Sequence, residues 1–145
     1  MARVEAFLND QVAVRPIAPA LKDSIGVSWT YAELNLAAEA AAAVLTEAGV
    51  CAGDRVMMLS ENCATAVAML FACWKIDAVI IPVNARQTAA EVARILDHAT
   101  PAVVVTTSAA SADAATHAGR LSGKAVCGSF GDIHLATPFD SAPDA

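Results

Sequence analysis

Residues 53–107 read GDRVMMLSENCATAVAMLFACWKIDAVIIPVNARQTAAEVARILDHATPAVVVTT, and this stretch decides the fold of the chain. Apolar runs at 55–59, 78–83 and 102–106 alternate with two segments whose apolar residues recur at helical spacing. Short strands that alternate with amphipathic helices predict a parallel sheet with helices packed on it. Because such sheets bind ligands at the carboxyl ends of their strands, the stretch also indicates where a functional site should be sought.

The helices of this pattern carry start signals. Thr30 is followed three residues later by Glu33, and Thr88 is followed by Glu91. Each pair predicts a capping box, in which the hydroxyl and the carboxylate accept hydrogen bonds from backbone N–H groups at the helix start. Asn62 is the expected N-cap of the helix between the first two strands.

Spacing also predicts which residues are buried. The helix after the first strand should bury a stripe at i, i+3, i+4 and i+7, which consists of Val67, Leu70, Phe71 and Trp74. The helix after the second strand should bury Val92, Ile95, Leu96 and Ala99. The continuous apolar run 78–83 predicts a strand that is buried on both faces.

The rest of the chain carries weaker signals of the same kinds. We expect a helix at 3–13, extended runs at 20–23 and 26–29, a helix at 111–119 and a strand at 125–127. From Gly128 onward the composition is typical of loops. The prediction is therefore an α/β domain over residues 1–135, with a mostly parallel sheet flanked by helices, and a flexible tail over residues 136–145.

Composition excludes several classes of protein. Hydrophobic residues make up 57% of the chain and charged residues 17%, which excludes a disordered protein. The 9 basic residues do not cluster, and 15 acidic residues bring the net charge to −6. We expect neither nucleic-acid binding nor a polybasic membrane patch, since both require clustered positive charge.

No transmembrane segment is expected, because the longest uncharged apolar run, Cys63–Trp74, is too short to span a bilayer. The first ten residues include acids at Glu5 and Asp10 and lack the apolar core of a signal peptide. These features predict a cytoplasmic location.

Cysteines and histidines predict neither disulfides nor a metal site. The four cysteines contain no CxxC pair, and the three histidines show no HExxH or similar spacing. We therefore expect free, buried thiols and no metal ligands among Cys51, Cys63, Cys73, Cys127, His98, His117 and His134.

Motifs with chemical meaning are scarce. The segment GRLSGKA at 119–125 is one residue short of a phosphate-binding P-loop, and Ala125 replaces the hydroxyl that would bind magnesium. It is interpreted as a plain loop, and GSFG at 128–131 lacks the dinucleotide-binding pattern. Asp54 and Glu61 flank the first strand and offer an acid–base pair. The favoured interpretation is a solvated turn residue and an acid at a helix start.

Arg86 is the one candidate binding residue. It lies just past the carboxyl end of the strand at 78–83, where α/β sheets bind ligands, and a guanidinium there suits a phosphate group. The alternative is a surface arginine that braces its loop.

Four segments run in the order found in one family: SWTYAEL at 28–34, AGVCAGDRV at 48–56, SENCATAVAMLFACWKIDAVIIPVNAR at 60–86, and TAAEVARILDHATPAVVV after it. On these residues the chain resembles the N-terminal portion of adenylate-forming enzymes, specifically the acyl-CoA synthetases (AMP-dependent synthetases and ligases). The likeness covers roughly residues 15–107.

The resemblance implies ATP-dependent activation of a carboxylic acid to an acyl-adenylate and then to a CoA thioester, as in fatty acid metabolism. It implies ATP, Mg²⁺ and coenzyme A for the full-length enzyme, and a lysine from a C-terminal domain. The family's phosphate loop, TSGTTGxPKG, does not occur in residues 1–145. The resemblance thus implies an enzyme fragment without catalytic residues, inactive alone, to which none of these ligands binds tightly.

Two positions depart from the family pattern. Asp77 stands where the family has a glycine with positive φ, at an expected cost of about 1 kcal/mol. Gln87 stands where the family often has leucine. In some acyl-CoA ligases, the arginine of the turn after the strand at 78–83 approaches the phosphates of coenzyme A. Arg86 occupies that position here.

Three hypotheses follow. The first is the N-terminal piece of an acyl-CoA synthetase, whose partner is the remainder of the enzyme. The second is a stand-alone α/β module that binds a small phosphorylated ligand near Asn84 and Arg86. The third is a non-catalytic interaction protein that pairs with a copy of itself through an exposed sheet edge. Whether the chain itself is an enzyme stays open.

Overall fold

The computed structural model describes residues 3–139, which form five α-helices and seven strands. The helices are α1 (Val4–Val14), α2 (Tyr31–Glu47), α3 (Ala64–Lys75), α4 (Ala89–Ala99) and α5 (Ala112–Arg120). The strands are β1 (Pro19–Lys22), β2 (Ser28–Thr30), β3 (Arg55–Ser60), β4 (Val79–Asn84), β5 (Val103–Thr106), β6 (Lys124–Gly128) and β7 (Gly131–Ala136).

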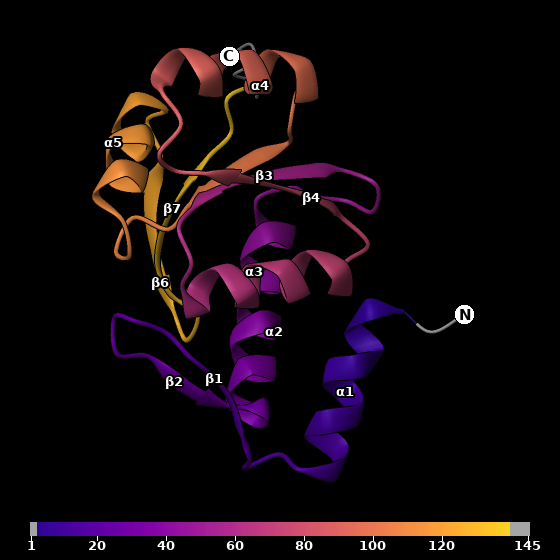
Figure 1. Ribbon diagram of the computed structural model, residues 1–145. Helices are drawn as coiled ribbons and strands as arrows, with labels where there is room; N and C mark the ends of the chain where they lie inside the picture. Colours follow the sequence, from indigo (N-terminus) through magenta and orange to yellow (C-terminus); the bar gives the residue numbers. More distant parts are fainter. Residues whose placement is uncertain (1–2, 140–145) are drawn as a thin grey trace.

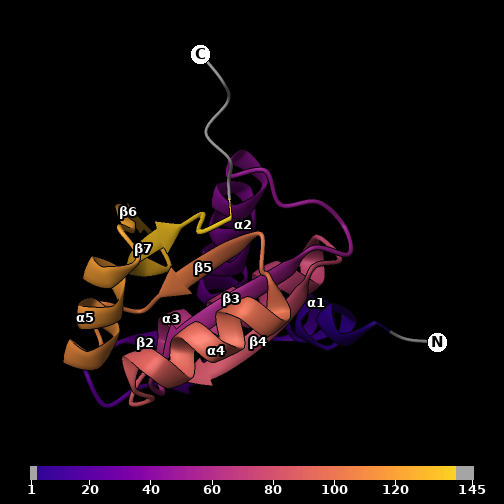
Figure 2. The same ribbon diagram turned by 90° about the horizontal axis from the view of Figure 1, so that it is seen from above.

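The main sheet has the order β4-β3-β5-β7-β6 and separates two layers of helices. Figure 1 shows α4 over one face of the sheet, with α5 beside it, and α3 and α2 under the other face. The view from above in Figure 2 shows α4 running along the strands β3 and β4 that it covers. Strands β1 and β2 form a separate antiparallel hairpin. The predicted α/β class is confirmed.

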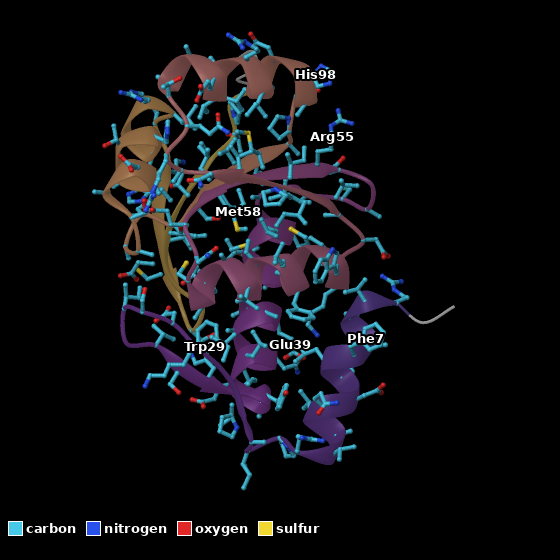
Figure 3. The ribbon with its side chains drawn as sticks, viewed as in Figure 1. Phe7, Trp29, Glu39, Arg55, Met58 and His98 are labelled. Atoms are coloured by element: carbon cyan, nitrogen blue, oxygen red, sulfur yellow. The ribbon has the colours of Figure 1, made fainter. Side chains whose placement is uncertain are left out.

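Successive side chains of the central strands alternate between the two hydrophobic cores, one on each face of the sheet. In β3, Val56 and Met58 pack in the core that α1, α2 and α3 share, whereas Met57 and Leu59 pack in the core under α4. Met58 is labelled between β3 and the helices below it in Figure 3. Because successive side chains of a strand point to opposite faces, a central strand covered on both faces must be apolar throughout.

Strand β4 lies at the edge of the sheet, so the prediction that it is buried on both faces is wrong. Val79 is 50% exposed and Pro82 is exposed, while Val83 is buried. A proline has no N–H to donate to a second neighbour, which suits an edge position. An apolar run therefore identified a strand here without identifying its place in the sheet.

Sequence reasoning missed strand β7, which lies in the region interpreted as loop. It pairs antiparallel with both β5 and β6, so the sheet is mixed. GSFG forms the tight turn between β6 and β7, in which Gly131 has a φ of 109°.

 A Cβ atom at Gly131 would lie 2.7 Å from Thr65 Oγ1, which is too close, so only glycine fits this turn. The Thr65 hydroxyl donates to the carbonyl of Phe130 over 2.6 Å, and the Phe130 ring is buried against the core.

Both capping boxes are confirmed. Thr30 and Glu33 exchange hydrogen bonds with each other's backbone N–H groups at the start of α2, and Thr88 and Glu91 do so at the start of α4. The predicted cap at Asn62 is wrong. The N-cap of α3 is Cys63, whose side chain makes no capping hydrogen bond.

Helix α3 buries a different face from the predicted one. Val67, Leu70, Phe71 and Trp74 are only partly buried, and the fully buried residues are Ala64, Ala66, Ala68, Met69, Ala72 and Cys73. The helix is apolar on nearly every side, so spacing alone could not select the face. In α4 the prediction succeeds for Val92 and Leu96, which are buried.

The remaining expectations concern Asp77, the cysteines, membrane-spanning helices and the tail. Asp77 has φ 60°, the left-handed conformation for which the family's glycine is suited. All four cysteines are free, but only Cys63 and Cys73 are buried, so the expectation of burial is wrong for Cys51 and Cys127. No helix within residues 3–139 combines the length and the apolar character that a membrane crossing requires. Strand β7 ends at Ala136, and positions 140–145 of the predicted tail lie outside the described residues.

Candidate functional site

A cavity of about 580 Å³ opens at the carboxyl ends of β3 and β4. These two strands are parallel neighbours, and their last residues, Ser60 and Asn84, are register partners. The lining combines both strand ends with the β1–β2 turn and the loop before α5: Ser24, Ile25, Ser60, Glu61, Asn62, Pro82, Val83, Asn84, Arg86 and Ala110. The cavity therefore lies where a sheet of this type is expected to bind ligands.

Two residues of the lining, Glu61 and Arg86, form an ion pair. Arg86 donates from Nε to Glu61 Oε1 over 2.9 Å, and the Arg86 side chain is still 75% exposed. The Ser111 hydroxyl and the Arg86 guanidinium together hold the pKa of the Glu61 carboxyl below its usual value, since both stabilise the carboxylate. Arg86 thus braces its loop and also presents most of its guanidinium to solvent.

The turn that carries Arg86 is held by backbone and side-chain hydrogen bonds. Asn84 accepts from the Arg86 N–H through Oδ1 over 2.9 Å, and from the Gln87 N–H through its carbonyl over 3.1 Å. The Ala85 N–H donates to the Ser60 carbonyl over 3.0 Å, which ties the turn to the end of β3. Asparagine suits such a turn because its short side chain can accept from the backbone two residues on.

Sequence reasoning missed His117, whose ring contacts the backbone of this turn. The ring comes from α5, is buried, and places Nε2 3.0 Å from the carbonyl oxygen of Ala85 and 2.9 Å from that of Gln87. The sequence showed only a histidine within a weakly predicted helix. Nothing in the sequence indicated which loop it would contact.

Asp23, which was also missed, fixes the β1–β2 turn as a wall of the cavity. Its Oδ1 accepts from the N–H groups of Ile25 and Val27, and its Oδ2 accepts from the Ala64 N–H over 2.9 Å. The bond from Ala64, with further bonds from the turn, lowers the pKa of the Asp23 carboxyl. Asp23 therefore supplies the cap that α3 lacks locally, from 41 positions away along the chain.

A second polar cluster lies at the end of β5. Ser108 Oγ is 2.7 Å from His134 Nδ1 and 3.1 Å from Thr106 Oγ1. These three residues are not among those that line the cavity. Since two hydroxyls and an imidazole satisfy one another here, the cluster is a local link between β5 and β7.

The other candidates from the sequence, the Asp54–Glu61 pair and the segment 119–125, do not form a site. Asp54 precedes β3 and accepts from the Cys51 N–H, whereas Glu61 follows the strand, so a six-residue strand of about 20 Å lies between the two carboxylates. The segment 119–125 joins the end of α5 to β6 and precedes no helix. Within residues 3–139 no group of three or more His, Cys, Asp and Glu side chains is placed to hold a metal ion.

The chemistry of the lining limits what the cavity suits. It contains one cation, Arg86, and one carboxylate, Glu61, beside amides and hydroxyls. A guanidinium with exposed donors fits a single phosphate group. The same set does not fit a magnesium triphosphate, which needs several positive donors and carboxylate ligands for the ion.

Comparison with known proteins gives a consistent result. Residues 8–141 match the family of AMP-binding enzymes. The chain is 34% identical over 106 residues to the long-chain-fatty-acid–CoA ligase FadD13 of Mycobacterium tuberculosis, a match that covers 72% of this chain and 21% of FadD13. It is 39% identical over 71 residues to the fatty acid–[acyl-carrier-protein] ligase ScoC of Streptomyces coeruleorubidus, covering 49% of this chain and 14% of ScoC.

Solved structures agree with the sequence matches. The N-terminal domain of FACL13 from Mycobacterium tuberculosis superposes with a TM-score of 0.68 at 34% identity, covering 72% of this chain and 26% of that domain. VinN superposes with the same TM-score at 27% identity, covering 71% of this chain and 27% of VinN. The chain thus spans only 14% to 27% of the length of these relatives.

Proposed function

Because the chain belongs to the AMP-binding enzyme family, we propose that it acts as one part of an acyl-CoA ligase. Its role is to supply scaffold and one wall of the ligand approach, while segments outside residues 1–145 perform the chemistry. The complete ligase would activate a carboxylic acid with ATP and Mg²⁺ and pass the acyl group to coenzyme A. The likeness to FadD13 over 72% of this chain carries the proposal.

Arg86 is the proposed contact for a phosphate group of coenzyme A. Support comes from its position at the carboxyl end of β4, from its exposed guanidinium and from the Glu61 contact that orients it. The chain alone should hold ATP, Mg²⁺ and coenzyme A only weakly. Within the cavity Glu61 offsets the charge of Arg86, and no described carboxylate cluster is placed to bind the metal.

The proposed partner is the remainder of the ligase, and the proposed location is the cytoplasm. The edge strand β4 offers the contact surface, because Val79 is half exposed and its outer side has no neighbour within residues 3–139. Pairing of this edge with a second copy of the chain is the competing possibility. Sedimentation of the isolated chain distinguishes the two, since self-pairing predicts a dimer and the ligase partner predicts a monomer.

A hybrid enzyme tests the proposal. The matching segment of FadD13 is replaced by the segment of this chain, and acyl-CoA formation and pyrophosphate release are measured with a panel of fatty acids. We expect the hybrid to form acyl-CoA and the isolated 145-residue chain to release no pyrophosphate. A folded but inactive hybrid, or turnover by the chain alone, contradicts the proposal.

Arg86 is tested in the same hybrid. Arg86→Ala should raise the KM for coenzyme A by about tenfold, the order of one charge-assisted hydrogen bond, and leave pyrophosphate release unchanged. Arg94→Ala is the matched control, since Arg94 is an exposed arginine of α4 outside the cavity. Equal effects of the two substitutions contradict a specific role of Arg86.

A stand-alone binding module is the second candidate function. The observation that favours it is that residues 24–110 alone enclose the cavity around Glu61 and Arg86. Calorimetry of the isolated chain with coenzyme A, AMP and inorganic phosphate tests it. Heat of binding that Arg86→Ala abolishes supports the module, and its absence at millimolar ligand rejects it.

A further inference from the structure

We infer that His117 is the positioning residue for Arg86: it holds the carbonyl groups on either side of Arg86 and so fixes the direction in which the guanidinium enters the cavity. As a statement about a ligand, the inference rests on the proposed function. As a statement about the Glu61–Arg86 pair, it can be tested without any ligand.

The geometry at the His117 ring carries the inference. Nε2 lies 3.0 Å from the Ala85 oxygen and 2.9 Å from the Gln87 oxygen. Carbonyl oxygens only accept hydrogen bonds, so Nε2 must carry a hydrogen and donate to both of them. One ring N–H therefore holds the Ala85–Arg86 and Gln87–Thr88 peptide groups, which lie just before and one residue after Arg86.

Burial makes this contact consequential. His117 is 4% exposed, and Ala85 is fully buried. If the ring were replaced by an apolar side chain, the Ala85 carbonyl would lose its donor in a place with little access to water. Leaving such a group unpaired is costly, so the turn would rotate to find another donor. Arg86 belongs to the first of these peptides and is one residue from the second, so it would move with the turn.

The same helix also acts on Glu61. Ser111 is the N-cap of α5, and its hydroxyl stabilises the Glu61 carboxylate. His117 follows six residues later, about 9 Å along the helix axis. The N-cap residue of α5 thus supports the carboxylate, and the second turn of the helix supports the turn that carries Arg86. Because one helix supports both residues, Glu61 and Arg86 stay close enough to pair, although they follow different strands.

The test compares two substitutions in α5 of the isolated chain. His117→Leu removes the donor, and Ala114→Gly is the matched control, because Ala114 is buried in the same helix and its methyl group donates no hydrogen bond. Folding of each variant is checked by circular dichroism and thermal unfolding. The readout is the pKa of the Glu61 side-chain carboxyl, followed by carbon-13 NMR during a pH titration.

In the wild-type chain Glu61 should titrate below 4.5, its ordinary value. His117→Leu should move the Glu61 pKa upward toward that value, because Arg86 leaves its place, whereas Ala114→Gly should leave it unchanged. An unchanged Glu61 pKa in a folded His117→Leu variant overturns the inference. Equal upward shifts in both variants also overturn it, since they indicate general loosening of the helix.

A measurement on the wild-type chain covers the case in which His117→Leu does not fold. Long-range nitrogen–proton NMR spectra of the ring identify the nitrogen that carries the hydrogen. A ring with hydrogen on Nε2 supports the inference, and a ring with hydrogen on Nδ1 alone overturns it. If the wild-type chain binds no coenzyme A, the phosphate role of Arg86 fails, but the Glu61 titration still decides the role of His117.

Discussion

The Nε atom of Arg86 lies 2.9 Å from Oε1 of Glu61, and this contact joins the loop after β4 to the loop after β3. The two residues are 25 positions apart and meet because their strands are parallel neighbours that end at the same edge of the sheet. The pair both orients the only arginine of the cavity lining and offsets its charge. Any anionic ligand must therefore compete with Glu61.

Removing that competition should strengthen anion binding. Glu61→Gln keeps the shape of the side chain but removes its charge, so affinity for coenzyme A in the hybrid ligase should rise by no more than about fivefold, the order of an exposed ion pair. Titration with coenzyme A measures the effect, and Glu91→Gln on α4, outside the lining, is the control. Weaker binding would show that the orienting role of Glu61 outweighs its charge.

Asp23 should give stability a specific pH dependence. Its folded-state pKa is lowered from 3.8, first by the hydrogen bond from the Ala64 N–H, so its contribution is present above pH 3.8 and is lost as the pH falls through the lower folded-state pKa. Asp23→Asn should therefore unfold at a lower urea concentration than wild type near pH 6, with the gap closing below pH 3.8. Asp97→Asn on the exposed side of α4 should show no such gap. A gap that persists unchanged at pH 3 would argue against the ionised form.

Asp77→Gly should stabilise the protein. Asp77 has φ 60°, and glycine adopts this conformation without strain, so the free energy of unfolding should rise by about 1 kcal/mol. The lost ion pair with Arg3 counts for little because both side chains are more than half exposed. Chemical denaturation measures the change, and Asp77→Asn separates charge from backbone conformation. Destabilisation by both substitutions would show that the ion pair dominates.

Thiol labelling should divide the cysteines into two classes. Cys51 and Cys127 are exposed and should react in the folded protein, whereas Cys63 and Cys73 should react only on unfolding. Burial raises the pKa of the Cys73 thiol to about 12, which suppresses its thiolate further. Mass spectrometry after peptide digestion identifies the labelled sites. Rapid labelling of Cys73 in the folded chain would contradict the packing of α3.

Asp132 should slow the reaction of Cys127. A hydrogen bond and the negative charge of Asp132 raise the pKa of this thiol and reduce the thiolate at neutral pH. Asp132→Asn should therefore accelerate labelling of Cys127 and leave Cys51, which is remote in sequence and also exposed, at its former rate. Equal acceleration at both positions would point to loss of structure instead.

Much of the fold could be predicted because its signals are local. The capping boxes at Thr30 and Thr88 join residues three positions apart, and the apolar runs of β3 and β5 mark strands that are covered on both faces. For the site, the sequence predicted only its location at the carboxyl ends of the strands and one candidate residue, Arg86. Its partners Glu61 and His117 carried no signal of that role, since a carboxylate at a helix start and a histidine on a helix occur in many settings.

The sequence by itself determined the order and type of most elements and the family resemblance, since periodicity and caps depend on residues within a few positions of one another. Only the tertiary structure decided that β4 lies at the edge, that β7 inserts antiparallel beside β5, and that Asp23 caps α3. It also decided that His117 supports the turn of Arg86. These contacts and the Glu61–Arg86 pair join residues 25 to 41 positions apart. Their partners are set by how the strands and helices pack, which no local pattern encodes.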